Sequence, residues 1–330
     1  MAKIVVVTGA GAGVGRATAL EFARRGYDVA LLSRDPERLE ALATAVRAVG
    51  RRALPIPTDV AMAEQVEAAA ARVEDELGPI DTWINVAMAT VFAPVSELTA
   101  QELLRATQVT YLGQVHGMMA ALKRMRTRKH GSIVNVGSAL AYRSVPLQSA
   151  YCGAKAAIRG FTDSLRSEIM HDRLHIRLTM VQLPALNTPQ FDWALNKTGK
   201  KAQPVPPIFE PEVAARAIHF AATHRRREVW VGYSSVQAII ANRIAPGLLD
   251  RYLAKRGYSA QLSKTPLPQP APANLFHPVP GHHSAHGRFD ARASATSVQM
   301  FTDRHRQAVV LGVAVAAVLA LRALLPRRRR

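Results

Sequence analysis

The sequence predicts an α/β fold in which a doubly wound parallel sheet carries helices on both faces. Between residues 1 and 232, short β-branched or apolar runs alternate with amphipathic stretches of helical length. Such alternation is typical of repeated right-handed strand–helix–strand units. The first run, Lys3 to Val7, is short, apolar and followed by a glycine turn, as in a strand buried on both faces. A C-terminal linker and a hydrophobic helix are expected to follow the sheet.

The remaining elements follow in chain order from the same periodicities. Apolar runs bounded by turn residues predict strands at 3–7, 28–32, 53–57, 81–86, 132–136, 176–182 and 228–232. Apolar residues at three- and four-residue spacing predict helices at 14–25, 36–49, 63–77, 100–124, 149–171 and 211–223. Pro36 suits the first turn of its helix. Each predicted strand is separated from the next by a helix, so neighbouring strands are expected to be parallel.

The chain changes character near residue 259. We expect one Rossmann-type catalytic domain over 1–258 and a Pro- and His-rich flexible linker over 259–307, because prolines dominate its first part and periodicity is lost. Residues 308–326 are almost continuously apolar and approach the roughly 20 residues that a membrane span needs. We interpret them as a membrane anchor, followed by a basic tail at 327–330. A core or amphipathic helix is the alternative, which the lack of a polar face disfavours.

Charge and cysteine content exclude several classes of protein. The formal net charge is +19, and the basic tail beside an apolar segment fits anionic lipid better than nucleic acid, which is not expected as a partner. The only cysteine, Cys152, excludes an intramolecular disulfide, and it is expected to pack rather than react. His282, His283 and His286 lack nearby carboxylate or thiolate partners in the sequence, so we expect no metal site.

A glycine-rich turn follows the first predicted strand and opens the first predicted helix. It runs from Thr8 to Gly15. Glycines allow the backbone to approach a pyrophosphate, and the helix N-terminus offers N–H groups to it. The second strand ends at Ser33-Arg34. A hydroxyl and a guanidinium suit a 2′-phosphate, so NADP(H) is favoured over NAD(H).

Tyr151 and Lys155 are four residues apart on a predicted helix, so their side chains share one face. A phenol titrates near pH ~10, and a neighbouring ammonium lowers that pKa, which would let Tyr151 exchange a proton with an alcohol or carbonyl. Ser138 follows a predicted strand, at the edge of the sheet where ligands bind, and could hydrogen-bond the reacting oxygen.

The glycine turn, Ser138 and the Tyr151/Lys155 pair, in this order, resemble the short-chain dehydrogenase/reductase family over residues 1 to about 232. The resemblance implies that Ser138 binds the substrate oxygen, Tyr151 transfers the proton and Lys155 orients the nicotinamide ribose. It also implies a homodimer or homotetramer. A fourth catalytic position corresponds to Thr110, which would hold a water that links Lys155 to solvent. The cofactor-binding residues that follow from the turn and the resemblance are Gly9, Gly11, Gly13, Val14, Gly15, Ser33, Arg34, Asp59, Val60, Asn85, Ala87, Tyr151, Lys155, Pro184 and Thr188.

This sequence departs from the family pattern where Val86, Met88, Thr110 and Ala185 stand. By the same resemblance, residues 187–210 cover the substrate, and their aromatic and apolar side chains favour a hydrophobic small molecule. Residues 236–256 mix apolar and basic side chains. That segment suits a membrane surface, the domain itself or a second subunit equally.

Together these features predict a membrane-associated, NADP(H)-dependent oxidoreductase that interconverts an alcohol and a ketone or aldehyde, with its catalytic domain in the cytoplasm. The alternative is a membrane-tethered dinucleotide sensor or scaffold with little catalysis, which the departures at Val86, Met88 and Thr110 motivate.

Overall fold

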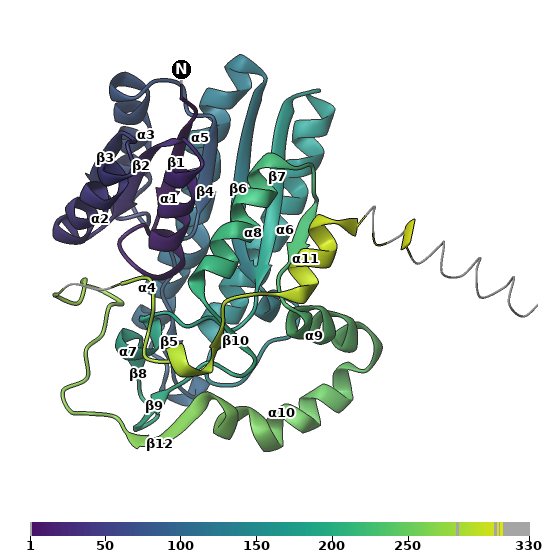
Figure 1. Cartoon of the computed structure of the whole chain (residues 1–330). Coiled ribbons are helices and arrows are strands. Elements are labelled where there is room, and N and C mark those ends of the chain that lie inside the picture. Colours follow the sequence, from purple (N-terminus) through teal and green to yellow (C-terminus); the bar gives the residue numbers. More distant parts are fainter. Residues whose placement is uncertain (1, 282–283, 307–308, 310, 313–330) are drawn as a thin grey trace, which may run out of the picture.

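The computed structural model describes residues 2–281, 284–306, 309 and 311–312. At its centre lies a seven-stranded parallel sheet with the strand order β11-β7-β6-β4-β1-β2-β3 (Figure 1). The strands are β1 (Ile4–Thr8), β2 (Asp28–Ser33), β3 (Ala53–Pro57), β4 (Thr82–Asn85), β6 (His130–Ser138), β7 (His175–Leu183) and β11 (Glu228–Trp230). The strand order reverses between β1 and β4, where a crevice for ligands is expected. This confirms the predicted doubly wound sheet.

Helices cover both faces of the sheet. On one face lie α1 (Gly13–Arg24), α2 (Pro36–Ala48) and α8 (Pro211–Thr223). On the other lie α3 (Ala63–Glu76), α4 (Ala100–Thr107), α5 (Gly113–Arg128) and α6 (Ser149–His171). Strand β1 serves both cores, because Val5 and Val7 join the first while Ile4 and Val6 join the second. Successive strand side chains point to opposite faces, so an all-apolar strand is required here.

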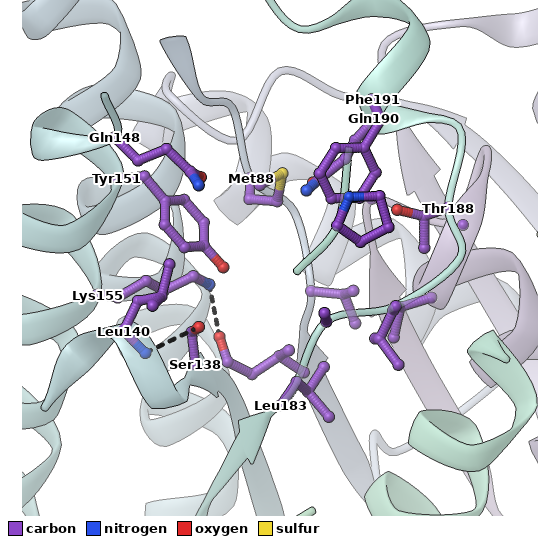
Figure 2. Close-up of a pocket in the computed structure, with 18 of the residues that line it drawn as sticks. Met88, Ser138, Leu140, Gln148, Tyr151, Lys155, Leu183, Thr188, Gln190 and Phe191 are labelled. Atoms are coloured by element: carbon purple, nitrogen blue, oxygen red, sulfur yellow. Dashed lines mark hydrogen bonds between the residues drawn. The ribbon is translucent and has the colours of Figure 1, made fainter. Parts of the chain in front are cut away.

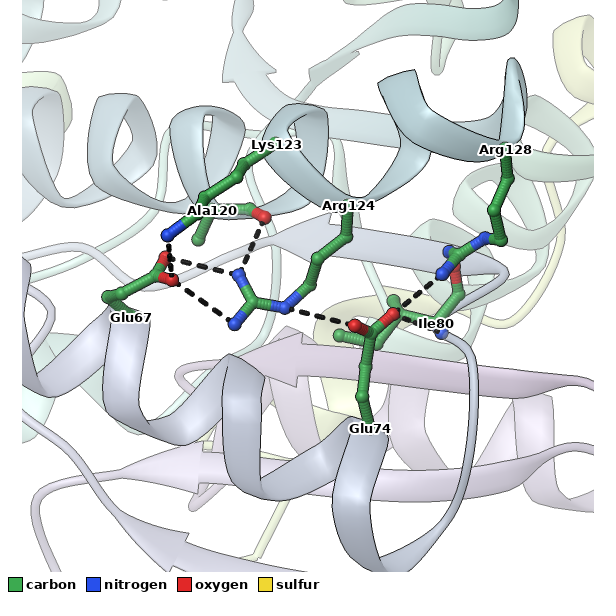
Figure 3. Close-up of polar contacts among 7 residues, drawn as sticks. All are labelled: Glu67, Glu74, Ile80, Ala120, Lys123, Arg124 and Arg128. Carbon is green, nitrogen blue, oxygen red and sulfur yellow. Dashed lines mark hydrogen bonds and ion pairs between the residues drawn. The ribbon is translucent and has the colours of Figure 1, made fainter.

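Ion pairs fasten α3 to α5 on the second face (Figure 3). Glu67 accepts from Lys123 Nζ at 2.8 Å and from Arg124, and Glu74 accepts from Arg128 Nη1 at 2.7 Å. Isolated surface pairs stabilise little, but a network that includes the largely buried Arg124 restricts the sliding of one helix on the other. The contact therefore helps to hold α3 and α5 together on this face of the sheet.

The predicted helix at 100–124 is interrupted. A capping box between Thr99 and Glu102 starts α4, a π-helical turn covers Gln108–Leu112, and α5 then begins at Gly113. Single π turns are frequent at functional sites. The turn brings the Thr110 hydroxyl to the backbone of Ala89, where it accepts from the N–H at 2.9 Å and donates to the carbonyl at 2.7 Å.

Further helices and strands lie outside the central sheet and its covering helices. They are β5 (Val91–Phe92), α7 (Gln190–Trp193), β8 (Leu195–Asn196), β9 (Lys200–Ala202), β10 (Ile208–Phe209), α9 (Tyr233–Ile244) and α10 (Pro246–Gln261). One-turn 3-10 helices lie at Val95–Glu97, Ala139–Ala141 and Asp290–Arg292. Pro246 starts α10, so the apolar and basic stretch at 236–256 is divided between two helices.

The segment predicted as a non-packing linker packs against the domain. Its first part forms β12 (Leu262–Pro266), which pairs with β9, and later β13 (Ala293–Ser294) pairs with β10. Met300 of α11 (Val298–Arg304) is buried in the core beneath α1 and α8. We call residues 274–281 and 284–290 the strap. The strap is held mainly by hydrogen bonds that its backbone carbonyl groups accept. Proline residues do not prevent such bonds, and the periodicity of the sequence does not reveal them.

Apart from residues 309, 311 and 312, the predicted anchor at 308–326 and basic tail at 327–330 lie outside the described residues, as do His282 and His283. No helix within the described part of the chain is both long and apolar enough to cross a membrane.

Candidate active site

A cavity of about 500 Å³ opens at the carboxyl ends of the sheet strands. The glycine turn after β1, the ends of β2 and β6, helix α6 and the segment after β7 all contribute side chains to its wall. This is the crevice that the reversal of strand order predicts. Of the residues predicted to bind cofactor or act in catalysis, all but Asn85 and Thr110 line the cavity.

The glycine turn is packed too tightly for side chains at two positions. A Cβ atom on Gly15 would lie 2.1 Å from the carbonyl oxygen of Gly9, and one on Gly9 would lie 2.8 Å from the Cα of Ala87. Gly9 also has a φ of +67°, which favours glycine. The turn therefore brings the N-terminus of α1 to the cavity wall with no side chain at these two positions, as a pyrophosphate-binding turn requires.

Ser138, Tyr151 and Lys155 gather on one side of the cavity (Figure 2). Ser138 ends β6, and its hydroxyl accepts from the N–H of Leu140 at 3.1 Å. The Lys155 ammonium lies 5.5 Å from the centre of the Tyr151 ring and donates to the Val136 carbonyl at 2.7 Å. The helical spacing of Tyr151 and Lys155 and the end of β6 thus place three reactive groups together.

Burial controls the protonation of the two titratable groups. It raises the pKa of the Tyr151 phenol above its ordinary value, an effect that a hydrogen bond with the Ser138 side chain partly opposes. Burial also lowers the pKa of Lys155 to about 7. The sequence predicts that Lys155 lowers the pKa of Tyr151. In the structure burial dominates instead, since the lysine is itself desolvated and directed at a carbonyl oxygen.

Thr110 and Asn85 have structural partners in place of the predicted roles. The Thr110 hydroxyl is committed to both backbone groups of Ala89. Asn85 is fully buried, accepts from Trp83 Nε1 at 2.8 Å and donates to Asn135 Oδ1 at 2.9 Å. Both therefore shape the loop after β4 from behind the cavity wall. Asn135 and Ala89 lie 50 and 21 residues away along the chain from Asn85 and Thr110, so the local sequence does not indicate these partners, whereas Trp83 belongs to the same strand as Asn85.

The end of β2 offers basic groups and a hydroxyl, while its nearby acid is already engaged. Asp35 caps α2 by accepting from the Arg38 N–H at 3.1 Å, and its second oxygen pairs with Arg38 Nε at 3.0 Å. Both oxygens of the Asp35 carboxylate are therefore engaged, although the residue lines the cavity. Arg34 lines the cavity but donates from its terminal nitrogens to carbonyl oxygens of the strap.

Opposite Tyr151 the cavity wall is mainly apolar. Figure 2 shows Met88 and Phe191 facing the side that carries Tyr151 and Lys155. The sequence does not indicate three further groups in the wall. They are the amides Gln148 and Gln190, the α10 residues Tyr252, Leu253 and Arg256, and the strap residues Asn274 and Pro278. The two amides lie close in sequence to predicted site residues but belong to no motif, whereas the α10 and strap residues reach the cavity through the folding of distant segments.

The chain is similar to proteins of a known family. Residues 3–198 match the family model described as short chain dehydrogenase. An uncharacterized oxidoreductase from Bacillus subtilis, YxnA, is 28% identical over 320 residues, which cover 96% of this chain and 89% of that protein.

Solved structures show the same fold. A short-chain dehydrogenase from Streptomyces avermitilis superposes with a TM-score of 0.64 at 29% identity, covering 78% of this chain and 95% of that one. An alcohol dehydrogenase from Thermococcus sibiricus, solved with 5-hydroxy-NADP, has a TM-score of 0.59 at 25% identity and covers 70% of this chain and 96% of that one. Both are matched over nearly their full length, so part of this chain has no counterpart in them.

Proposed function

The chain belongs to the short-chain dehydrogenase family and is an NAD(P)-dependent oxidoreductase, and from that premise we propose that it interconverts an alcohol and a ketone or aldehyde on a hydrophobic small molecule, using NADP(H). One observation carries the proposal. Ser138, Tyr151 and Lys155 line one cavity together with the glycine turn and an apolar wall. A carbonyl compound held against Met88 and Phe191 would place its oxygen near the hydroxyl groups of Ser138 and Tyr151.

The residues of this chain would divide the work as follows. The bound dinucleotide supplies the hydride chemistry. The glycine turn and the first turn of α1 would hold its pyrophosphate. The Ser138 hydroxyl would donate to the substrate oxygen, and Tyr151 would give a proton to that oxygen or accept one from it. The raised pKa of Tyr151 keeps its phenol protonated at neutral pH, which suits proton donation to a carbonyl oxygen. Lys155 would hold the ribose beside Tyr151.

The preference for NADP(H) rests on the end of β2. Ser33 and two arginines line the cavity there, and the carboxylate of Asp35, which also lines it, is engaged by its cap and ion pair. An NAD site usually offers an acid to the ribose 2′-hydroxyl, whereas guanidinium groups suit a 2′-phosphate. The Thermococcus sibiricus enzyme was solved with an NADP derivative, which supports the same choice for this chain.

Replacing Tyr151 by Phe tests the mechanism. The change removes the hydroxyl that exchanges the proton and keeps the ring, so we expect turnover to fall by about 10²–10⁴-fold, the usual contribution of a general acid or base. NADPH affinity, measured by fluorescence titration, should stay nearly constant. Turnover is followed at ~340 nm, the absorbance of the reduced nicotinamide, with a panel of hydrophobic ketones and aldehydes. Full turnover by Tyr151→Phe would refute the assignment.

A second function is favoured by one observation. The Thr110 hydroxyl is committed to the backbone of Ala89, so the water path predicted to link Lys155 to solvent lacks that group. A dinucleotide sensor or scaffold with little catalysis would need no such path. Tight NADPH binding by the wild-type protein without turnover of any compound in the panel would favour the sensor.

A further inference from the structure

The strap runs along the outer edge of the cofactor groove. Its successive carbonyl groups meet the basic side chains after β2 and then the start of α1, where Ser284 accepts from the Gly13 N–H at 3.2 Å. Beyond that point the Gly287 N–H donates to the carbonyl of Asn187, beside Thr188. In Figure 1 this segment follows β12 and returns towards β10. The strap therefore lies alongside the cofactor groove from the end of β2 to Thr188.

The strap is hydrogen-bonded to Arg34, the arginine that the sequence predicts to bind a 2′-phosphate. Arg34 Nη2 donates to the Asn274 carbonyl at 2.5 Å, and Nη1 donates to the Phe276 carbonyl at 2.9 Å. Leu275 between them is fully buried in the core beneath α3 and α4. A phosphate could bind Arg34 only if these hydrogen bonds were broken. The buried side chain of Leu275 holds this part of the strap in place and so opposes its displacement.

Two polar atoms on the groove side of β2 and α2 are buried and have no hydrogen-bond partner in the described part of the chain. They are the Ser33 hydroxyl oxygen and Arg38 Nη2. The Arg38 side chain is only 9% exposed, and both residues line the cavity. A buried, unpaired guanidinium nitrogen is costly unless an acceptor arrives. The two atoms therefore form a ready pair of donors for an anion.

We propose that Arg38 and Ser33, and not Arg34, receive the 2′-phosphate of NADP(H), under a strap that keeps Arg34 occupied. The proposal rests on the proposed function. Ser33 is the last residue of β2 and lies next to Gly11, where an added Cβ would come within 2.9 Å of the serine oxygen and 3.6 Å of Arg38 Cβ. The absence of a side chain at Gly11 leaves room beside the Ser33 hydroxyl. The first turn of α1 would still hold the pyrophosphate, through N–H groups other than that of Gly13, which the strap already binds.

The guanidinium of Arg38 is positioned for this task by three contacts. Its Nε is held by Asp35 at 3.0 Å and by the Gly281 carbonyl of the strap at 3.1 Å. Its Cζ lies 5.0 Å from the centre of the Trp193 ring. The guanidinium is thus held at Nε, and its buried Nη2, which has no partner among the described residues, can make a charge-assisted bond.

Matched substitutions separate the two arginines. We would measure dissociation constants for NADPH and NADH by fluorescence titration in the full chain with Arg38→Gln, Arg34→Gln and Ser33→Ala. Arg38→Gln should reduce the preference for NADPH over NADH by about 10–100-fold, the range expected for one hydrogen bond to a charged group. Ser33→Ala should reduce it by a smaller factor. Arg34→Gln loosens the strap and should change both affinities by a similar factor, leaving the preference intact.

The alternative results are distinct. A loss of NADPH preference in Arg34→Gln as large as that in Arg38→Gln overturns the proposal, as does an equal loss of both nucleotides in Arg38→Gln, which would place that side chain on the pyrophosphate. Ser33→Ala lies outside α2 and serves as the readout if Arg38→Gln fails to fold. A wild-type chain that binds neither nucleotide would instead refute the proposed function.

Discussion

Lys155 combines a functional position with an unfavourable environment for its charge. It is 1% exposed, it makes one hydrogen bond to a carbonyl, and its pKa falls to about 7. Near neutral pH the fold therefore carries the cost of a partly charged, desolvated ammonium. Natural sites tolerate such a cost when the residue is needed for activity.

Replacing Lys155 by Met should stabilise the protein and abolish turnover. Met has a similar length and no charge, and we expect the free energy of unfolding at pH ~7 to rise by about 1–4 kcal/mol. The unfolded lysine keeps its proton up to pH ~10.4, whereas the folded lysine loses it near pH 7. Between these values the unfolded state binds more protons, so the wild-type stability rises with pH relative to the variant.

Urea unfolding of both proteins at several pH values from ~6 to ~10 measures this difference. The advantage of Lys155→Met should be largest at the acid end and shrink as pH rises. A variant that is less stable than the wild type at every pH would show that the ammonium is well compensated in the fold.

At the residue scale, the sequence predicts those site residues that belong to a local motif. The Tyr151 and Lys155 spacing, Ser138 at a strand end and the glycine turn all reach the cavity as expected. Asn85 and Thr110 do not line the cavity, because their side chains are hydrogen-bonded to the buried Asn135 and to the backbone of Ala89, which lie elsewhere in the chain. The engagement of Arg34 by the strap is likewise invisible locally, since its partners are more than 200 residues away.

At the scale of elements, periodicity predicts the sheet and the helices that cover it. Each predicted strand of the central sheet is present, with ends shifted by two residues at most. The segment after residue 259 is different, because prolines suppress periodicity there. Its order comes from carbonyl groups bound by arginines and from single buried side chains such as Leu275 and Met300. Such tertiary contacts leave no pattern in the local sequence.

Replacing Leu275 by Ala should release the strap without unfolding the sheet. Leucine-to-alanine changes in cores cost about 2–5 kcal/mol, and the loss should fall mainly on the strap, which has few other buried apolar side chains. Hydrogen exchange is expected to increase in residues 274–281 and 284–290 while β6 keeps its protection. Phe276→Ala is the matched control, since that neighbouring side chain is 42% exposed. Unchanged exchange in Leu275→Ala would mean that the arginine contacts alone hold the strap.

For the whole molecule, α9 and α10 present an exposed face that mixes apolar and basic side chains. Ile244 is 78% exposed and Leu248 is 64% exposed, and Arg243 and Arg251 stand exposed near them. Tyr252 of the same helix also lines the cavity mouth. The face fits an anionic lipid surface or a second subunit, so we propose a membrane-associated enzyme in the cytoplasm that assembles as a homodimer or homotetramer. Sedimentation of the detergent-solubilised chain would measure its assembly.

The membrane proposal rests on residues 308–326, whose apolar length approaches that of a span. We expect the full chain to float with vesicles that contain anionic lipid. A carboxylate near the centre of a span costs about 2.5–3.5 kcal/mol on insertion scales, so the paired change Val315→Glu and Leu319→Glu should abolish flotation. NADPH affinity should be unaffected, because these positions lie far along the chain from every residue of the cavity wall. If the paired variant still floats, the exposed face of α9 and α10 becomes the contact, and Ile244→Ser with Leu248→Ser should then remove it. If the wild-type chain does not float, neither residues 308–326 nor the exposed face of α9 and α10 binds lipid. A second subunit is then the expected partner of that face.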